Sequence, residues 1–155
     1  MELTIEQALQ QGVAAHKEGK LQDAERLYRA ILQSQPKHPD ANHNLGVLAV
    51  TVNKADVALP LFKIALKANP KIEQFWLSYI DALIKVQQFK KAAQVIAQAQ
   101  RQGLAGEKLK FSETQLKSST QAPELLSTSK KQNLTLKEKR KKLNQTQKEK
   151  KTLLS

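Results

Sequence analysis

Apolar residues recur along most of the chain at the three- and four-residue spacings of amphipathic helices. Leu21, Ala24, Tyr28 and Ile31 form one such stripe, which predicts a helix from Leu21 to about Ser34. Comparable segments follow one another up to about residue 104, separated by short stretches rich in glycine, asparagine or proline. The pattern therefore predicts an all-α fold of short helices joined by tight turns.

The helical pattern repeats every 34 residues, with two helices in each unit. Two glycines in the middle of predicted helices, Gly12 and Gly46, are separated by this step. Because a helical glycine costs about 1 kcal/mol relative to alanine, we expect a second helix to pass close to each of them. The same step joins Ala24 to Ala58 and Ala92, Tyr28 to Phe62 and Ile96, Ile31 to Ala65 and Ala99, and Pro36 to Pro70. It also joins Gly19 to Asn53, and we expect a left-handed turn that ends a helix at both, since glycine and asparagine adopt that conformation most readily.

Local signals place the boundaries of these units at about 5–38, 39–72 and 73–104. Thr4 and Gln7 form a capping box that opens the first helix. In the second unit, Pro60 is tolerable only in the first turn of its helix, so we expect that helix to begin a residue or two late. In the third unit, the residues expected to face inward are Trp76, Tyr79, Ile80 and Leu83.

The residues that recur at this 34-residue step resemble those of the tetratricopeptide repeat, whose pattern is W-x2-L-G-x2-Y, then A-x3-F, then P. The resemblance implies a right-handed superhelical array of helix-turn-helix repeats, an α-solenoid, over about residues 5–104. In the third unit, Ile80 replaces the glycine and Leu104 the proline, so this unit is a candidate end of the array. The matching positions are Asn42, Leu45, Gly46, Ala49, Ala58, Phe62 and Pro70 in the second unit, Ala24, Tyr28 and Pro36 in the first, and Trp76, Ala92 and Ala99 in the third.

The last third of the chain differs in composition. Residues 1–106 carry 13 Lys/Arg and 9 Asp/Glu, whereas residues 107–155 carry 13 and 5, so most of the net charge of +12 lies after residue 106. Leu109, Phe111 and Leu116 predict a capping helix over the last repeat, which completes a unit of residues 1–116. We expect a linker at 117–135 and a basic, largely disordered tail at 136–155 with some helix propensity.

The residue types present exclude several kinds of chemistry. There is no cysteine, and no catalytic arrangement or phosphate-binding glycine loop can be assembled, so we expect neither an enzyme nor a cofactor. His38, Asp40 and His43 lie close in sequence but lack typical metal-ligand spacing, so no metal site is predicted. The sequence shows no secretory signal and no apolar run long enough to span a membrane, which favours a cytoplasmic protein.

The resemblance also implies where a ligand would bind, because the first helices of such repeats line a concave groove. The residues that chaperone-binding repeats use to clamp a C-terminal carboxylate are replaced here by apolar residues and Asp81, so we do not expect that clamp. Asn44 matches the asparagine ladder of O-linked N-acetylglucosaminyltransferase, but Gln10 and Ser78 interrupt it. The apolar groove could instead contact the capping helix of the same chain. The predicted groove residues are Leu9, Val13, His16, His43, Asn44, Val47, Val50, Leu77, Asp81 and Ile84, flanked by Glu6, Asp40 and Gln74.

We interpret the chain as a protein-interaction scaffold or adaptor whose groove binds an extended or helical segment of a protein partner. The first alternative is a substrate-presenting repeat region of a glycosyltransferase or sulfotransferase, or a shortened relative of such an enzyme. The second is binding of nucleic acid or another polyanion by the basic run, although no aromatic residue interleaves it. The residues of that run are Lys137, Lys139, Arg140, Lys141 and Lys142.

Overall fold

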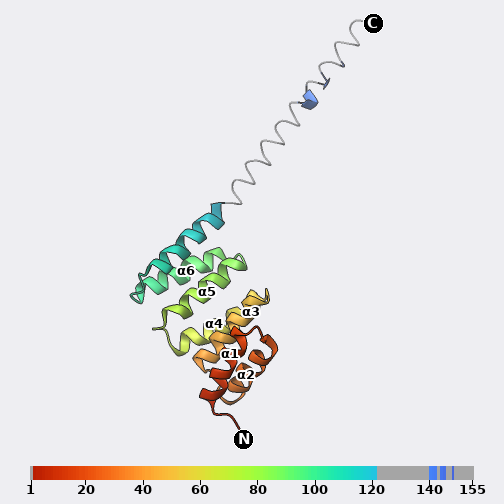
Figure 1. Ribbon diagram of the computed structural model, residues 1–155. Helices are drawn as coiled ribbons and strands as arrows, with labels where there is room; N and C mark the ends of the chain where they lie inside the picture. Colours follow the sequence, from red (N-terminus) through yellow and green to blue (C-terminus); the bar gives the residue numbers. More distant parts are fainter. Residues whose placement is uncertain (1, 122–139, 143, 146–147, 149–155) are drawn as a thin grey trace. The chain divides into compact units, whose positions relative to one another are not determined.

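The computed structural model describes residues 2–121, 140–142, 144–145 and 148. The chain divides into two units, Met1–Leu116 and Lys117–Ser155. The first unit is all-α, and its successive helices form hairpins that follow one another (Figure 1). Its helices are α1 Ile5–Lys17, α2 Leu21–Ser34, α3 Pro39–Thr51, α4 Ala55–Ala68, α5 Glu73–Lys85 and α6 Phe89–Arg101. This arrangement confirms the predicted array of helix-turn-helix repeats.

The turns within the hairpins adopt left-handed backbone conformations at a 34-residue interval. Gly19, Asn53 and Gln87 have φ angles of 77°, 61° and 63°. The conformation of Gly19 and Asn53 agrees with the prediction, since glycine and asparagine adopt it most readily. Gln87 was not predicted, because a glutamine gives no such signal in the sequence. Each pair of helices is therefore reversed by the same turn geometry.

The two helical glycines lie where an aromatic ring of the second helix packs against the first. A Cβ atom on Gly46 would lie 2.5 Å from Cε1 of Phe62, and one on Gly12 would lie 2.6 Å from Cε1 of Tyr28. Both rings are fully or almost fully buried. Glycine is thus required by the close approach within each of the first two repeats, as predicted.

Two details at helix starts bear on the sequence predictions. The capping box of α1 is confirmed, because Gln7 N donates to Thr4 Oγ1 and Thr4 N donates to Gln7 Oε1. The expected late start of the fourth helix is wrong: α4 begins at Ala55, and Pro60 is inside it. Pro60 removes the donor for the carbonyl of Asp56, but both residues are exposed, so water can satisfy that carbonyl.

A further helix begins at residue 107, 34 residues after the start of α5, and continues to residue 121. Leu109 and Leu116 are buried in the core cluster of the second and third repeats, so this helix covers the end of the array. Phe111 was expected to join them but is 63% exposed, because it lies about 200° around the helix from Leu109. Residues 117–121 are helical although we predicted a linker from residue 117; residues 122–135 lie outside the described part of the chain.

Candidate functional site

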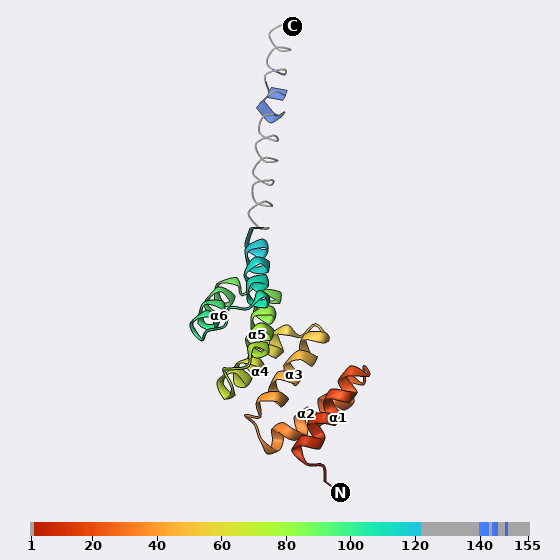
Figure 2. The same ribbon diagram turned by 60° about the vertical axis from the view of Figure 1, so that its left-hand side comes forward.

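The candidate site is the surface formed by the first helix of each repeat. α1 contacts α3, and α3 contacts α5, so these helices lie side by side (Figure 2). We call the surface that carries the predicted groove residues the helix-A face. One of these ten residues, His43, is buried, and the other nine are half-buried: Leu9, Val13, His16, Asn44, Val47, Val50, Leu77, Asp81 and Ile84.

The apolar residues of the helix-A face have one side in the core and part of their surface open. Val47, Val50, Leu77 and Ile84 pack against the large core cluster of the second and third repeats. Leu9 packs against the two smaller clusters, which join the first repeat to α3 of the second. Side chains held in this way lose little further rotamer freedom when an apolar ligand group covers them, which lowers the entropic cost of binding.

His43 joins the second and third repeats from beneath the face. Its ring centroid is 4.7 Å from that of Phe75 and 5.6 Å from that of Phe62. Its Nε2 atom shares a hydrogen bond of 2.8 Å with Oγ of Ser78. Only 9% of His43 is exposed, so this residue supports the face more than it lines it.

The environment of His43 also affects its charge. Burial lowers the pKa of His43, while the neighbouring Asn44 amide and Asp40 carboxylate act in the opposite direction. The net shift is downward, so the imidazole is neutral at pH 7. A neutral ring is suited to a buried hydrogen bond with a serine hydroxyl, because it brings no unpaired charge into the core.

Polar groups are interspersed with these apolar residues. Gln74 Nε2 donates a hydrogen bond of 3.2 Å to Ser78 Oγ, which extends the network of His43 to the exposed surface. Asp81 forms a 3.0 Å ion pair with Lys85 one turn later in α5, and both side chains are about half exposed. The face therefore combines open apolar patches with amide and carboxylate groups that can bond to a peptide backbone.

Phe111 extends this pattern into the terminal helix. It follows Leu77 by 34 residues and so occupies the register of Leu9, His43 and Leu77. At 63% exposure it is the most open of the exposed large apolar residues in the described part of the chain. Phe111 was not among the predicted groove residues, although the 34-residue step continued beyond residue 104 leads to it.

Other chemistry finds little support in the described residues. They contain no group of three or more His, Cys, Asp and Glu side chains that could hold a metal ion. None of the described helices is both long and apolar enough to cross a membrane. In the basic run, Lys137 and Lys139 lie outside the described residues, and residues 140–142 are helical and exposed.

A family model described as tetratricopeptide repeat matches residues 9–51 and 43–105, which is more than half of the chain. No protein with a curated description matches the chain significantly.

Several solved structures share the fold. A tetratricopeptide repeat protein from Parabacteroides merdae is similar at a TM-score of 0.70 and 18% identity, over 76% of this chain and 46% of that one. The first such domain of human RPAP3 gives a TM-score of 0.67 and 15% identity, over 76% and 92%. The type III secretion chaperone SycD of Yersinia enterocolitica gives 0.64 and 18%, over 82% and 97%. The chain thus spans less than half of the Parabacteroides protein and nearly all of the other two.

Proposed function

Because the chain belongs to the tetratricopeptide repeat family, we propose that it is a protein-interaction module that binds an extended or helical peptide segment on its helix-A face. The observation that carries this proposal is the row of half-buried apolar residues on α3 and α5, Val47, Val50, Leu77 and Ile84. They are supported by the core beneath them and remain open on the outer side.

The chemistry of the face suits a peptide. Apolar side chains of the ligand would cover the four residues on α3 and α5, while its backbone amides would bond to the exposed Gln74 and the half-buried Asn44. The Yersinia chaperone of similar fold was solved with a peptide of the translocator YopD, which supports the same class of ligand here. Two alternatives stay predictions: a relation to the repeat regions of transferases, and polyanion binding by the basic tail. No observation on the described residues favours either one.

The test uses peptides selected by the full chain from a random twelve-residue display library. Val47→Glu with Leu77→Glu adds two carboxylates to the centre of the helix-A face, and burial of an unpaired carboxylate beneath a ligand is costly. We expect a loss of at least about tenfold in affinity, which corresponds to about 1.4 kcal/mol. Circular dichroism and denaturant unfolding of each variant show whether the repeats stay folded.

The matched control adds the same charges outside the face. Leu3 and Val57 are 46% and 48% exposed, so Leu3→Glu with Val57→Glu should leave both the fold and the peptide affinity unchanged. A milder pair, Val47→Thr with Leu77→Asn, replaces the first if the glutamates unfold the protein. Selected peptides that bind both pairs and the wild type equally would show that the helix-A face is not the binding site.

A further inference from the structure

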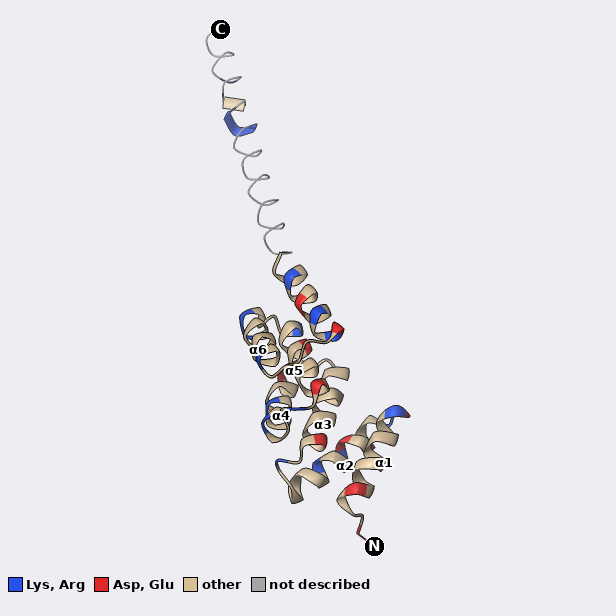
Figure 3. Cartoon of the chain, turned by 90° about the vertical axis from the view of Figure 1, so that its left-hand side faces the viewer, with Lys and Arg blue, Asp and Glu red and all other residues tan. Residues whose placement is uncertain are grey.

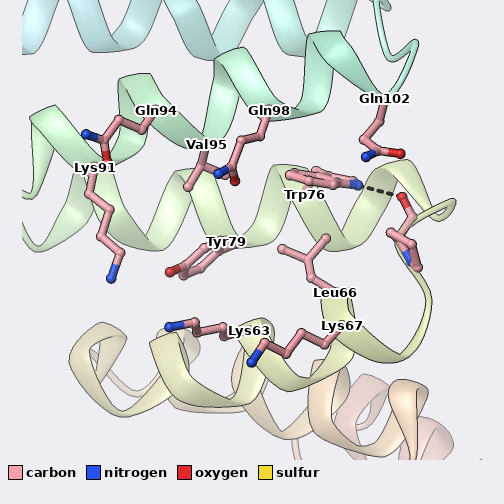
Figure 4. A pocket seen from close by; sticks show the side chains of 11 residues that line it. Lys63, Leu66, Lys67, Trp76, Tyr79, Lys91, Gln94, Val95, Gln98 and Gln102 are labelled. Carbon is pink, nitrogen blue, oxygen red and sulfur yellow. Dashed lines mark hydrogen bonds between the residues drawn. The ribbon is translucent and has the colours of Figure 1, made fainter.

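A pocket lies between the second helices of the second and third repeats, apart from the helix-A face. Residues of α4, α5, α6 and the adjoining turns line an open pocket of about 360 Å³ (Figure 4). Its floor is apolar and nearly buried, with Leu66, Trp76, Tyr79 and Val95 between 5% and 8% exposed. The Trp76 indole N–H donates a 2.7 Å hydrogen bond to the carbonyl oxygen of Pro70, which fixes the ring in the pocket wall.

Three lysines surround this pocket. Lys63 and Lys67 come from α4 and Lys91 from α6, and all three are exposed. Figure 4 shows the hydroxyl group of Tyr79 directed toward the end of the pocket where the ammonium groups of Lys63 and Lys91 lie. A hydroxyl donor and two cations therefore meet at one end of an apolar cavity.

The positive charge around the pocket has few acidic residues near it: α6 contains none, and the one acidic residue of α4 is Asp56 in its first turn. Residues 57–72 and 86–106 contain six Lys or Arg residues and no Asp or Glu. None of the three rim lysines forms an ion pair with a described residue. Figure 3 shows lysine and arginine along α4 and α6.

The second helix of the first repeat behaves differently. In α2, Arg26 lies 3.6 Å from Asp23 and Arg29 lies 2.8 Å from Glu25, so each cation has an acidic neighbour on its own helix. The rim lysines form no such ion pairs, so unpaired positive charge gathers on α4 and α6, two of the three helices that line the pocket. Such a field attracts acidic ligands and speeds their association.

We propose that this pocket binds an acidic peptide segment of a partner protein. One apolar side chain of the segment enters the cavity against Trp76 and Val95, and the carboxylates on either side of it pair with Lys63, Lys67 and Lys91. A cavity of this size is at the small end of ligand pockets, which fits a single anchoring side chain. The chain's own C-terminal third is excluded as the occupant, because it is itself strongly basic.

The pocket favours a peptide over a nucleic acid. Binding of single strands relies on aromatic faces that are open for bases to stack on. Trp76 and Tyr79 are only 7% and 5% exposed, so they offer a wall and not a stacking platform. Gln94 and Gln98 at the pocket edge supply amide groups that can bond to a peptide backbone.

Trp76 provides a local reporter, since it is the only tryptophan of the chain. The probe is an eight-residue peptide of Asp and Glu with one central Leu, blocked at both ends, and the matched peptide has Ala in place of Leu. With the full-length protein in about 150 mM salt, we expect a saturable change in Trp76 emission and about fivefold tighter binding of the Leu peptide. The absence of binding at millimolar peptide would overturn the proposal.

Charge reversal then tests whether the acidic peptide binds at the pocket lysines or is attracted only by the net positive charge of the chain. Lys63→Glu with Lys67→Glu and Lys91→Glu should weaken binding at least tenfold. The control Lys17→Glu with Lys37→Glu and Lys54→Glu changes the net charge by the same amount at exposed positions elsewhere, and it should keep most of the affinity. Equal losses in the two triple variants would overturn the proposal.

Two further measurements complete the test. Gln98→Phe places a ring at the pocket mouth from an exposed position and should abolish the preference for the Leu peptide. Val47→Glu with Leu77→Glu on the helix-A face should leave the acidic peptide bound. Peptide binding without a change in Trp76 emission would assign the attraction to the basic tail. A larger Trp76 response to single-stranded DNA of equal charge would assign the pocket to nucleic acid; either result contradicts the proposal.

Discussion

Gly46→Ala adds one methyl group at the point where α3 passes closest to α4. The new Cβ would lie 2.5 Å from Cε1 and 2.8 Å from Cδ1 of Phe62. Carbon atoms in favourable contact are about 3.5–4.0 Å apart, so the ring would have to move by roughly 1 Å. Phe62 is 1% exposed and packed on all sides, which leaves it no free space to enter.

The expected magnitude combines two opposing effects. Overpacking a close-packed core lowers the free energy of unfolding by about 1–3 kcal/mol, whereas replacing a helical glycine by alanine raises it by up to about 1 kcal/mol. Because the clash involves a rigid, buried ring, we expect the upper part of the range and a net loss of about 1–2 kcal/mol. With a urea m-value of about 2 kcal/mol/M, the unfolding midpoint should fall by about 0.5–1 M.

The assay is urea unfolding of the full chain followed by circular dichroism at 222 nm. Ala93→Gly, at an exposed position in α6, measures the helix-propensity contribution without any clash and should cost about 1 kcal/mol. In a Phe62→Leu background the ring is gone, so Gly46→Ala should become neutral or stabilising. The reasoning is refuted if Gly46→Ala stabilises the wild type, or if its cost is the same with and without the ring.

Three smaller predictions concern single buried or strained groups. The pKa of His43 is lowered from its ordinary value of 6.5, so below about pH 6.5 the unfolded chain binds a proton that the folded chain does not. The difference in free energy of unfolding between the wild type and His43→Phe should therefore favour the wild type most above pH 6.5. In unfolding titrations this difference should shrink as the pH falls toward 5, by at most about 1.4 kcal/mol per pH unit. A difference that grows on acidification would contradict the burial of a neutral ring. Gln87→Gly should raise the free energy of unfolding by about 0.5–1 kcal/mol, because the φ angle of 63° strains a side chain that glycine lacks; a lower denaturation midpoint would contradict it. The Tyr28 hydroxyl is buried without a hydrogen-bond partner among the described residues, so Tyr28→Phe should be neutral or stabilising by up to about 1 kcal/mol in the same assay, and a loss above 1 kcal/mol would reveal a missing partner.

The order of helices and the close approaches were predictable because they rest on local signals repeated at a fixed step. Glycine lowers the stability of a helix, so Gly12 and Gly46 indicated a close approach by another element. The aromatic residues 16 positions later, Tyr28 and Phe62, make that approach. The turn at Asn53 was predictable for a similar reason, since few residue types adopt its conformation.

Features that depend on long-range partners were not predictable. The left-handed turn at Gln87 has no signal in its residue type and follows only from the 34-residue step that begins at Gly19 and Asn53. The burial of His43 depends on Phe75 and Ser78, which belong to the next repeat. The late start predicted from Pro60 was wrong because a proline in the interior of a helix can lie on its exposed side.

The candidate site was predicted only in part. The open apolar residues of α3 and α5 follow from the repeat register, whereas the lysine-rimmed pocket arises from α4, α5 and α6 together and has no signature in any one segment. The absence of acidic residues from 57–72 and 86–106 was visible in the sequence, but its meaning required knowing that the two segments border one cavity.

The helix that begins at residue 107 has a consequence for the growth of such arrays. Leu109 and Leu116 fill the side that meets the third repeat. At the positions of Tyr79 and Ile80, which face the partner helix inside the third repeat, this helix carries Glu113 and Thr114. In a stack of similar units each layer contacts only its neighbours, so an apolar last layer would bind the end of another chain and allow end-to-end association. Glu113 accepts a 2.7 Å hydrogen bond from Gln100 of α6 and so faces the third repeat, whereas the exposed Thr114 keeps the outer side of the last helix polar. The side chains on this last layer therefore limit the length of the stack, and an apolar residue at 114 would favour end-to-end association of chains.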